Sequence, residues 1–242
     1  MRMPLLRGAI VVVALVFLGS CSATQTITLD ENGSGDAEVH VSIDPVFAAY
    51  LTDLSRGMGG DDETSLFDVE VIRASLQAQP GVTVNHIEPD GPRDLRVEVG
   101  FESLEHLLQV QERAAHRFIR FERTESFLRL AAAIDRAALE QIGKIAGIDP
   151  FVAEALLPAD DEMGPAEYRD YLGWAFEEYA EDRSMDTIFR ESRVITAIDP
   201  SGSVVQIRGG ESRNGTVQFV TPLVDAVTAQ EPLTYSLVYT RE

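Results

Sequence analysis

Short runs in which apolar and polar residues alternate recur along this chain, and clusters of turn-forming residues separate them. In residues 37–43 an apolar side chain stands at every second position, and residues 30–36 just before them are rich in Asp, Asn, Ser and Gly. Alternation with a period of two places the apolar side chains of a strand on one face, and a Gly/Asn/Asp cluster between two such runs favours a β-hairpin. We therefore predict a hairpin over residues 26–43.

The rest of the chain carries the same signals together with helical ones. Further hairpins are expected over residues 82–101 and 116–134, and further strands over residues 194–198, 204–207, 217–220 and 233–239. Apolar residues three or four positions apart predict helices that begin at Asp44, near residue 65, and at Ser103, Asp135, Asp149 and Gly164. This pattern predicts an α+β fold of antiparallel β-hairpins packed with helices. We expect one globular body, residues 21–242, with a helix-rich segment at about 135–190.

The first 20 residues have the composition of an export signal. Arg2 and Arg7 supply positive charge, residues 8–18 are uninterruptedly apolar or Gly, and the small residues Gly19 and Ser20 follow. A helix needs about 20 apolar residues to span a bilayer, so this run is too short for a permanent span. We predict a signal peptide over residues 1–20.

The tetrapeptide Leu18-Gly19-Ser20-Cys21 resembles the lipobox of bacterial lipoproteins. That resemblance implies cleavage between Ser20 and Cys21 and acylation of the Cys21 thiol with chains such as palmitate. Cys21 is the only cysteine in the sequence, so the exported body has no intramolecular disulfide. The alternative is an ordinary secretory signal whose cleavage site includes a cysteine.

The chain is strongly acidic, with 40 Asp and Glu against 20 Lys and Arg and a formal net charge of −20. Such a body repels nucleic acid phosphates, and no basic patch offers attraction to anionic lipid headgroups. Nucleic acid is therefore excluded as a partner. We expect attachment to a membrane through the N-terminal acyl chains, with a lipid or an envelope protein as a further partner.

Motifs for catalysis or metal binding are missing. Residues 30–36 superficially suggest a calcium loop, but the twelfth position of an EF-hand requires Glu and Val41 stands there. The histidines, at positions 40, 86, 106 and 116, have no metal-ligand spacing, and no G-x-S-x-G occurs. The acidic clusters at 61–63 and 160–162 are expected to be solvated loops. No catalytic residue, metal ligand or cofactor is predicted, and the aromatic residues spaced helically over 168–179 are expected to face the core.

Residues 21–43 and 199–223 resemble the LppM-type lipoproteins of bacterial envelopes, mainly in their turn glycines between strands. The resemblance implies an α+β domain with a lipid-binding cavity and supplies no catalytic residue. Three hypotheses follow: a non-catalytic envelope lipoprotein with a binding or structural role, a lipid or glycolipid binder with an apolar cavity of about 300 Å³ or more, and a carboxylate-dependent envelope hydrolase. The expected location is the extracytoplasmic side of the cell envelope. In a diderm bacterium, Ser22 directly after the cysteine indicates the outer membrane. In a monoderm, the expected location is the outer face of the plasma membrane.

Overall fold

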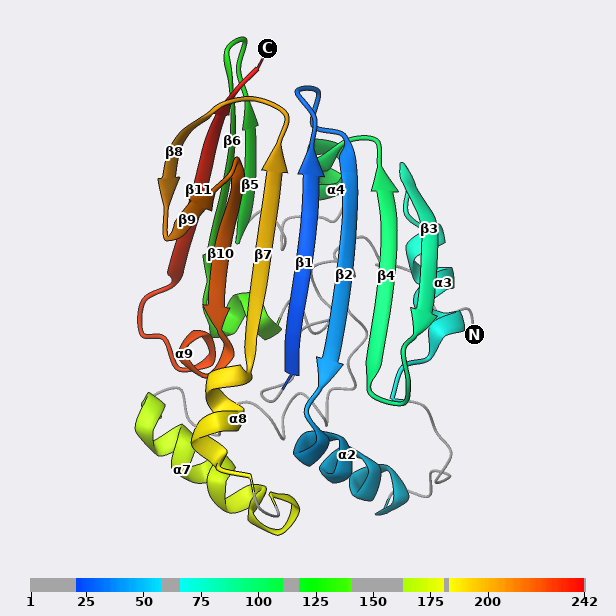
Figure 1. Ribbon diagram of the computed structural model, residues 1–242, viewed down its shortest axis with the longest axis vertical. Coiled ribbons are helices and arrows are strands. Elements are labelled where there is room, and N and C mark those ends of the chain that lie inside the picture. Colours follow the sequence, from blue (N-terminus) through cyan, green and yellow to red (C-terminus); the bar gives the residue numbers. More distant parts are fainter. Residues whose placement is uncertain (1–20, 58–65, 111–117, 141–162, 181–182, 242) are drawn as a thin grey trace.

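The computed structural model describes residues 21–57, 66–110, 118–140, 163–180 and 183–241. Across these residues the strands form two sheets, with helices at one end and along one side (Figure 1). The seven-stranded sheet has the order β3-β4-β2-β1-β7-β10-β9, and the four-stranded sheet has the order β5-β6-β11-β8. The chain therefore has the predicted α+β fold in a single body.

The strands are β1 (Cys21–Leu29), β2 (Gly35–Ile43), β3 (Val82–Pro89), β4 (Asp94–Phe101), β5 (Ile119–Arg123), β6 (Phe127–Ile134), β7 (Arg193–Pro200), β8 (Val204–Arg208), β9 (Gly210–Arg213), β10 (Thr216–Pro222) and β11 (Leu233–Thr240). The helices are α2 (Pro45–Gly57), α3 (Val69–Gln77), α4 (Leu104–Val110), α7 (Pro165–Ala175), α8 (Met185–Glu191) and α9 (Leu223–Val227), with the short 3-10 helix η2 (Glu177–Tyr179).

The hairpin predicted at the start of the body is present and begins earlier than expected. Strand β1 starts at Cys21, which pairs with Ile43 of β2. Gly33 takes a φ of 83° in the turn, a conformation that glycine adopts without strain. The Ser34 hydroxyl donates to Asp30 Oδ2 at 2.8 Å, so residues 30–36 are stabilised as a polar hairpin turn. The hairpins β3–β4 and β5–β6 also lie where the sequence places them.

The centre of the large sheet is a pairing between strands far apart in the sequence. Strand β1 runs parallel to β7, with Ala23 opposite Val194 and Leu29 opposite Pro200, whereas the other strand pairs are antiparallel. Hairpin signals are local, so they predict neighbouring strands and do not predict this parallel pair. It joins the N-terminal half of the large sheet to the C-terminal half.

The C-terminal strands pass from one sheet to the other. After β7 the chain turns at residues 201–203 and enters the small sheet as β8, and after β8 it returns to the large sheet as β9. Gly209 lies between β8 and β9 with a φ of 74°, and a Cβ there would stand 2.6 Å from the Thr234 carbonyl oxygen. Glycine is therefore required at this crossing both for its backbone conformation and for lack of space.

The helices α2, α7 and α8 gather at one end of the sheets, the lower end in Figure 1. Asp44 caps α2 by accepting from the Val46 amide at 2.9 Å, as its sequence position predicts. Helix α3 lies beside β3 and begins at Val69, later than the expected start near residue 65, because Asp68 is its cap and accepts from the Val71 amide. Within the helix-rich middle segment, residues 136–140, α7, η2 and α8 are helical. The helix expected from Asp149 lies outside the described residues.

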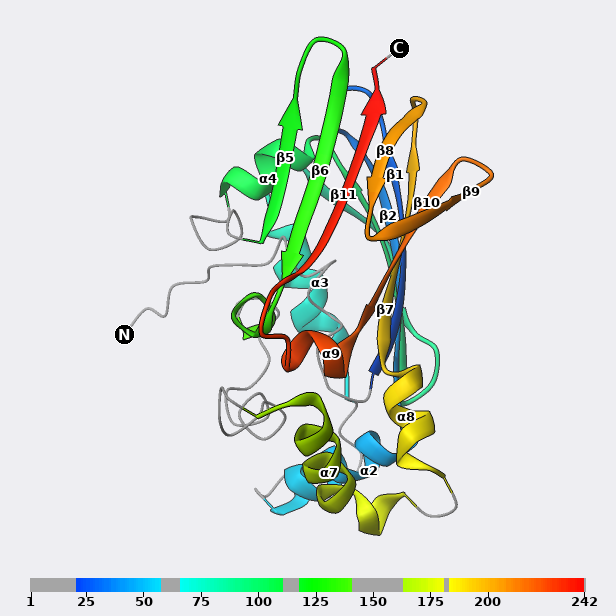
Figure 2. The same ribbon diagram turned by 90° about the vertical axis from the view of Figure 1, so that its left-hand side faces the viewer.

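The two sheets face each other across the main core, as the edge-on view in Figure 2 shows. The large sheet contributes side chains such as Leu29, Val39 and Val97, and the small sheet contributes Leu128 and Leu237, all at most 1% exposed. This inter-sheet layer is the part of the fold that contains a cavity.

Candidate ligand-binding site

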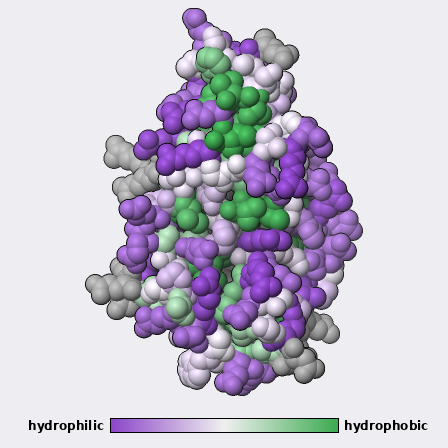
Figure 3. All heavy atoms as spheres, turned by 60° about the vertical axis from the view of Figure 1, so that its left-hand side comes forward, coloured by the Kyte–Doolittle hydropathy of each residue, from purple (hydrophilic) through white to green (hydrophobic). Residues whose placement is uncertain are grey.

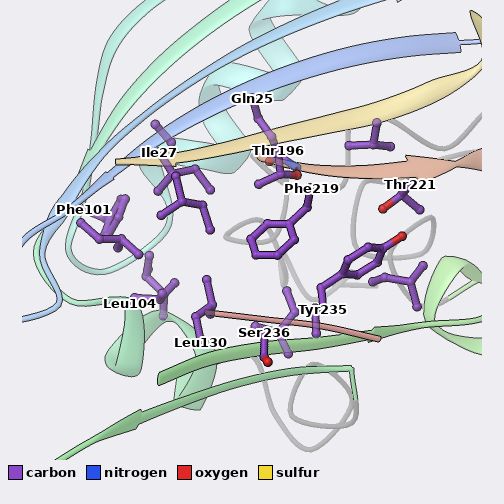
Figure 4. Close-up of a pocket in the computed structure, with 18 of the residues that line it drawn as sticks. Gln25, Ile27, Phe101, Leu104, Leu130, Thr196, Phe219, Thr221, Tyr235 and Ser236 are labelled. Carbon is purple, nitrogen blue, oxygen red and sulfur yellow. Dashed lines mark hydrogen bonds between the residues drawn. The ribbon is translucent and has the colours of Figure 1, made fainter. Parts of the chain in front are cut away.

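A cavity of about 170 Å³ lies between the two sheets and is partly open to solvent (Figure 4). Its walls come from both sheets and from α4. The large sheet provides Gln25, Ile27, Leu29, Ala37, Val82, Val99, Phe101, Val194, Thr196, Ile198, Phe219 and Thr221; the small sheet and α4 provide Leu104, Leu107, Ile119, Leu130, Ala132, Ile134, Tyr235 and Ser236. The cavity is smaller than the 300 Å³ set by the glycolipid hypothesis, so it does not enclose a whole glycolipid. Its size is close to an engineered cavity of about 150 Å³ that binds benzene.

The lining is apolar, and none of the residues that form it carries a formal charge. Because an ion buried there would lose its hydration without gaining a partner, the site selects neutral, apolar groups. A water molecule also needs two or more polar partners, which most of the wall does not offer. The chemistry that this space supports is the burial of a hydrocarbon group.

Gln25 brings a side-chain amide into this wall, besides the hydroxyls of Thr196, Thr221, Tyr235 and Ser236. It stands on the inward face of β1 in a row with Ala23, Ile27 and Leu29, and it is only 4% exposed. Its Nε2 donates to Thr196 Oγ1 over 2.6 Å, the hydrogen bond that Figure 4 shows as a dashed line. Its Oε1 is buried and has no hydrogen-bond partner within the described part of the chain.

Two aromatic rings connect the sheets along the cavity wall. Phe219 of β10 and Tyr235 of β11 meet edge to face with their centroids 5.7 Å apart, and Figure 4 shows both rings beside the cavity. The Tyr235 hydroxyl donates to the Val220 carbonyl oxygen at 3.1 Å, which fixes the ring. Burial raises the pKa of the Tyr235 phenol, so it is neutral at physiological pH and adds no charge to the wall.

The outer surface of the molecule over β8 to β11 is also partly apolar. Figure 3 shows apolar side chains among polar ones on the side of the molecule that comes forward from the left of Figure 1, where β8 to β11 lie. Val205 of β8 and Val220 of β10 are 54% and 40% exposed.

A second, open groove lies between α7, α8 and the outer face of β7 and β10. It has a volume of about 450 Å³, and Arg169, Arg190 and Arg193 are among its residues. Arg169 is paired with Asp225 at 3.0 Å, and Asp186 adds another carboxylate to the groove. Opposite charges therefore meet in this groove, and it has less defined chemistry than the inter-sheet cavity.

The lipidation and cleavage residues stay predictions. Cys21 is the first residue of β1, and Ser20 lies outside the described residues. No observation on the structure tests acylation or cleavage.

The helically spaced Tyr168, Tyr171, Phe176 and Tyr179 pack against the core as predicted, whereas Trp174 of the same segment is 74% exposed. Tyr168 and Phe176 are at most 1% exposed. Phe176 lies edge to face with Phe47 and Tyr50 of α2, at centroid distances of 5.9 and 5.2 Å. This stripe joins α7 to α2, far from the cavity lining, so it is a structural contact.

The histidines and acidic clusters do not form a site among the described residues. His40, His86 and His106 are exposed and lie apart, and no group of three or more His, Cys, Asp or Glu residues converges in the described ranges. His116 and the clusters at 61–63 and 160–162 fall outside those ranges. Sequence reasoning missed Gln25, although a polar residue on the inward face of an alternating strand was a usable signal.

Comparison of the sequence with protein-family models and with curated proteins finds no match. Among solved structures, the NMR structure of the folded domain of LppM from Mycobacterium tuberculosis matches with a TM-score of 0.45 and 11% sequence identity, over 93% of this chain and 92% of that chain. This likeness is weak. Within the described ranges, each helix is too short or too polar to cross a bilayer.

Proposed function

We propose that this chain is an exported, lipid-anchored protein of the cell envelope that acts without catalysis, by holding an apolar group between its two sheets. The inter-sheet cavity carries the binding part of the proposal, because its lining is apolar and uncharged. Space left unfilled in a core costs stability, roughly 24 cal/mol per Å³ in one measured series. An empty cavity of this size therefore lowers the stability of the protein, and an occupant that fills it restores the missing van der Waals contacts.

The size of the cavity limits what is bound. A volume of about 170 Å³ accommodates a small apolar molecule or part of one acyl chain, and the partial opening lets the remainder of a longer molecule extend outside. The carboxylate-dependent hydrolase gains no support from this cavity, since no Asp or Glu is among its lining residues.

The anchoring part of the proposal rests on the sequence Leu18-Gly19-Ser20-Cys21 behind its apolar run. Two or more acyl chains on one residue give stable membrane attachment, whereas one chain gives only marginal attachment. The body is then held on the extracytoplasmic side, at the outer membrane of a diderm or at the outer face of the plasma membrane of a monoderm.

The anchor is tested in the full chain expressed in a bacterial host, by replacing Cys21→Ser. We expect the wild-type chain to be cut before residue 21, to carry acyl chains by mass spectrometry and to sediment with membranes. The variant should lose all three properties. Unchanged processing and membrane partitioning in the variant would overturn the anchor.

The binding role is tested with the body from Cys21 onward, which contains all the described elements, carrying Cys21→Ser so that no acyl chain competes. Replacing Ala132→Leu fills the cavity from β6, and Ala131→Leu places the same side chain on the opposite face of the same strand. We expect hexane to bind the parent and the Ala131→Leu control and not the Ala132→Leu variant. Thermal unfolding of both variants confirms that each is folded, and hexane binding that Ala132→Leu leaves intact would place the ligand elsewhere.

A further inference from the structure

The carbonyl oxygen of Gln25 is a buried acceptor that the fold leaves unused. The side chain is 96% buried, its Nε2 is engaged by Thr196, and its Oε1 has no hydrogen-bond partner in the described part of the chain. A buried polar atom without a partner costs about 1–3 kcal/mol. The neighbouring inward positions of β1 hold Ala23, Ile27 and Leu29, so packing alone calls for an apolar residue at position 25.

We infer that the bound apolar molecule carries a neutral hydroxyl group, which donates a hydrogen bond to Gln25 Oε1 inside the cavity. This inference rests on the proposed binding function and adds to it the chemical class of the ligand. In Figure 4, Gln25 and Thr196 lie on the wall formed by β1 and β7, and Leu104 and Leu130 lie on the wall across the cavity. A ligand between these walls is mostly in contact with hydrocarbon, and Gln25 Oε1 is the lining atom that is buried and has no hydrogen-bond partner among the described residues.

A hydroxyl suits this point whichever way the amide is oriented. If the amide oxygen and nitrogen are exchanged, Oε1 faces Thr196 and the amide NH₂ becomes the unused group, because the two atoms are assigned from their hydrogen bonds. A hydroxyl group is both donor and acceptor, so it serves either orientation. An ether or an ester only accepts hydrogen bonds, so it can pair only with the amide NH₂ of the exchanged orientation.

Ligands that carry a carboxylate in place of the hydroxyl are excluded by their charge. A carboxylate has no proton to donate to Oε1, and no cationic side chain lines the cavity to stabilise it. The chain as a whole carries a net charge of −20, which adds long-range repulsion. The ligand class is therefore an alcohol or a hydroxylated acyl chain, with the hydroxyl-bearing part inside.

Three probes of equal chain length separate these cases: hexanol, hexane and hexanoate, titrated by NMR against the body from Cys21 onward with Cys21→Ser. The diagnostic variant is Gln25→Met, which keeps the length of the side chain and removes its hydrogen-bonding groups. Gln218→Met is the matched control, because Gln218 lies on the exposed face of β10 in the same sheet.

We expect the parent and Gln218→Met to bind hexanol about tenfold more tightly than hexane, the effect of one hydrogen bond to a buried acceptor, and to bind hexanoate weakly or not at all. In Gln25→Met the preference for hexanol should disappear while hexane still binds, which also shows that the variant is folded.

Equal affinities of hexanol and hexane for the parent would overturn the inference and leave the apolar site intact; a resident water molecule on Gln25 Oε1 would give that result. Tight hexanoate binding would also overturn it. If neither hexane nor hexanol binds the folded parent, the proposed binding function fails and the inference fails with it.

Discussion

Gln25 and Thr196 are 171 positions apart in the sequence and stand directly opposite each other in the parallel pair of β1 and β7, joined side chain to side chain at 2.6 Å. Their hydrogen bond is the polar link between the N-terminal and C-terminal halves of the large sheet on its inward face. Because one end of the Gln25 amide lacks a partner, the bond to the Thr196 hydroxyl is the only hydrogen bond that the amide makes among the described residues.

Replacing Thr196→Val should therefore destabilise the protein by about 1–3 kcal/mol, since the whole Gln25 amide is then buried without a partner. Adding Gln25→Met to this variant should restore most of the lost stability, because both polar groups are then replaced by apolar ones. Urea unfolding of the two single variants and the double variant gives the coupling free energy. Additive effects would show that the two side chains do not depend on each other.

Two glycines with ordinary backbone angles should respond in opposite directions to the same substitution. Gly173 lies inside α7, with open space where a Cβ would stand, so Gly173→Ala should stabilise by about 0.5–1 kcal/mol through helix propensity. At Gly202 a Cβ would lie 1.8 Å from the Thr240 carbonyl oxygen, so the turn after β7 must shift, and Gly202→Ala should cost about 1–3 kcal/mol or more. Thermal unfolding compares them, and equal shifts would contradict the assigned packing of residues 201–203.

Asp44 combines two roles at the end of β2. One carboxylate oxygen caps α2 through the Val46 amide, and the other pairs with Arg183, which also pairs with Glu191 of α8 at 2.8 Å. Asp44→Ala removes both contacts and should cost about 1–2 kcal/mol for the cap alone, with more from the ion pair. Asp44→Asn retains a capping oxygen and should cost less. If the two variants unfold at the same urea concentration, the cap contributes nothing.

Stability should fall at alkaline pH because of a buried phenol. Burial, with a smaller effect of Asp30, raises the pKa of Tyr239 to about 12 from 10.0. Between pH 10 and 12 the unfolded chain therefore releases this proton and the folded chain keeps it, so stability is complete below pH 10 and is lost as the pH rises through 12. Tyr239→Phe should move the alkaline unfolding midpoint upward.

At neutral pH the same substitution should stabilise the protein by about 1–3 kcal/mol, because it removes a buried hydroxyl that has no hydrogen-bond partner within the described ranges. Circular dichroism during base titration measures both effects. An unchanged alkaline midpoint in Tyr239→Phe would show that other groups, such as Tyr168 with its raised pKa, control the transition.

The features that the sequence predicted are those encoded within a few residues. Turn glycines such as Gly33 and Gly215 adopt positive φ values of 83° and 92°, which is the reason that turns can be recognised between alternating runs. Ser103 accepts from the His106 amide at 3.2 Å and begins α4 as predicted. In each case the chemistry of one or two side chains determines the local backbone.

The features that the sequence did not predict depend on contacts between distant segments. The parallel pairing of β1 with β7 and the crossing between sheets at Gly209 have no local signature that separates them from further hairpins. Gln25 falls outside the predicted hairpin, because the recognisable alternating run starts at Thr26, whereas β1 starts at Cys21. The volume of the cavity depends on how both sheets fill the space between them, and no period in the sequence encodes it.

Strand β1 begins at Cys21 and is paired with β2 from that residue onward and with β7 from Ala23 onward. A pull applied at that residue acts along the strand axis, so it loads two rows of backbone hydrogen bonds in shear at the same time and does not peel them apart one by one. An anchor on Cys21, as proposed, would therefore transmit tension directly to the central strand of the large sheet.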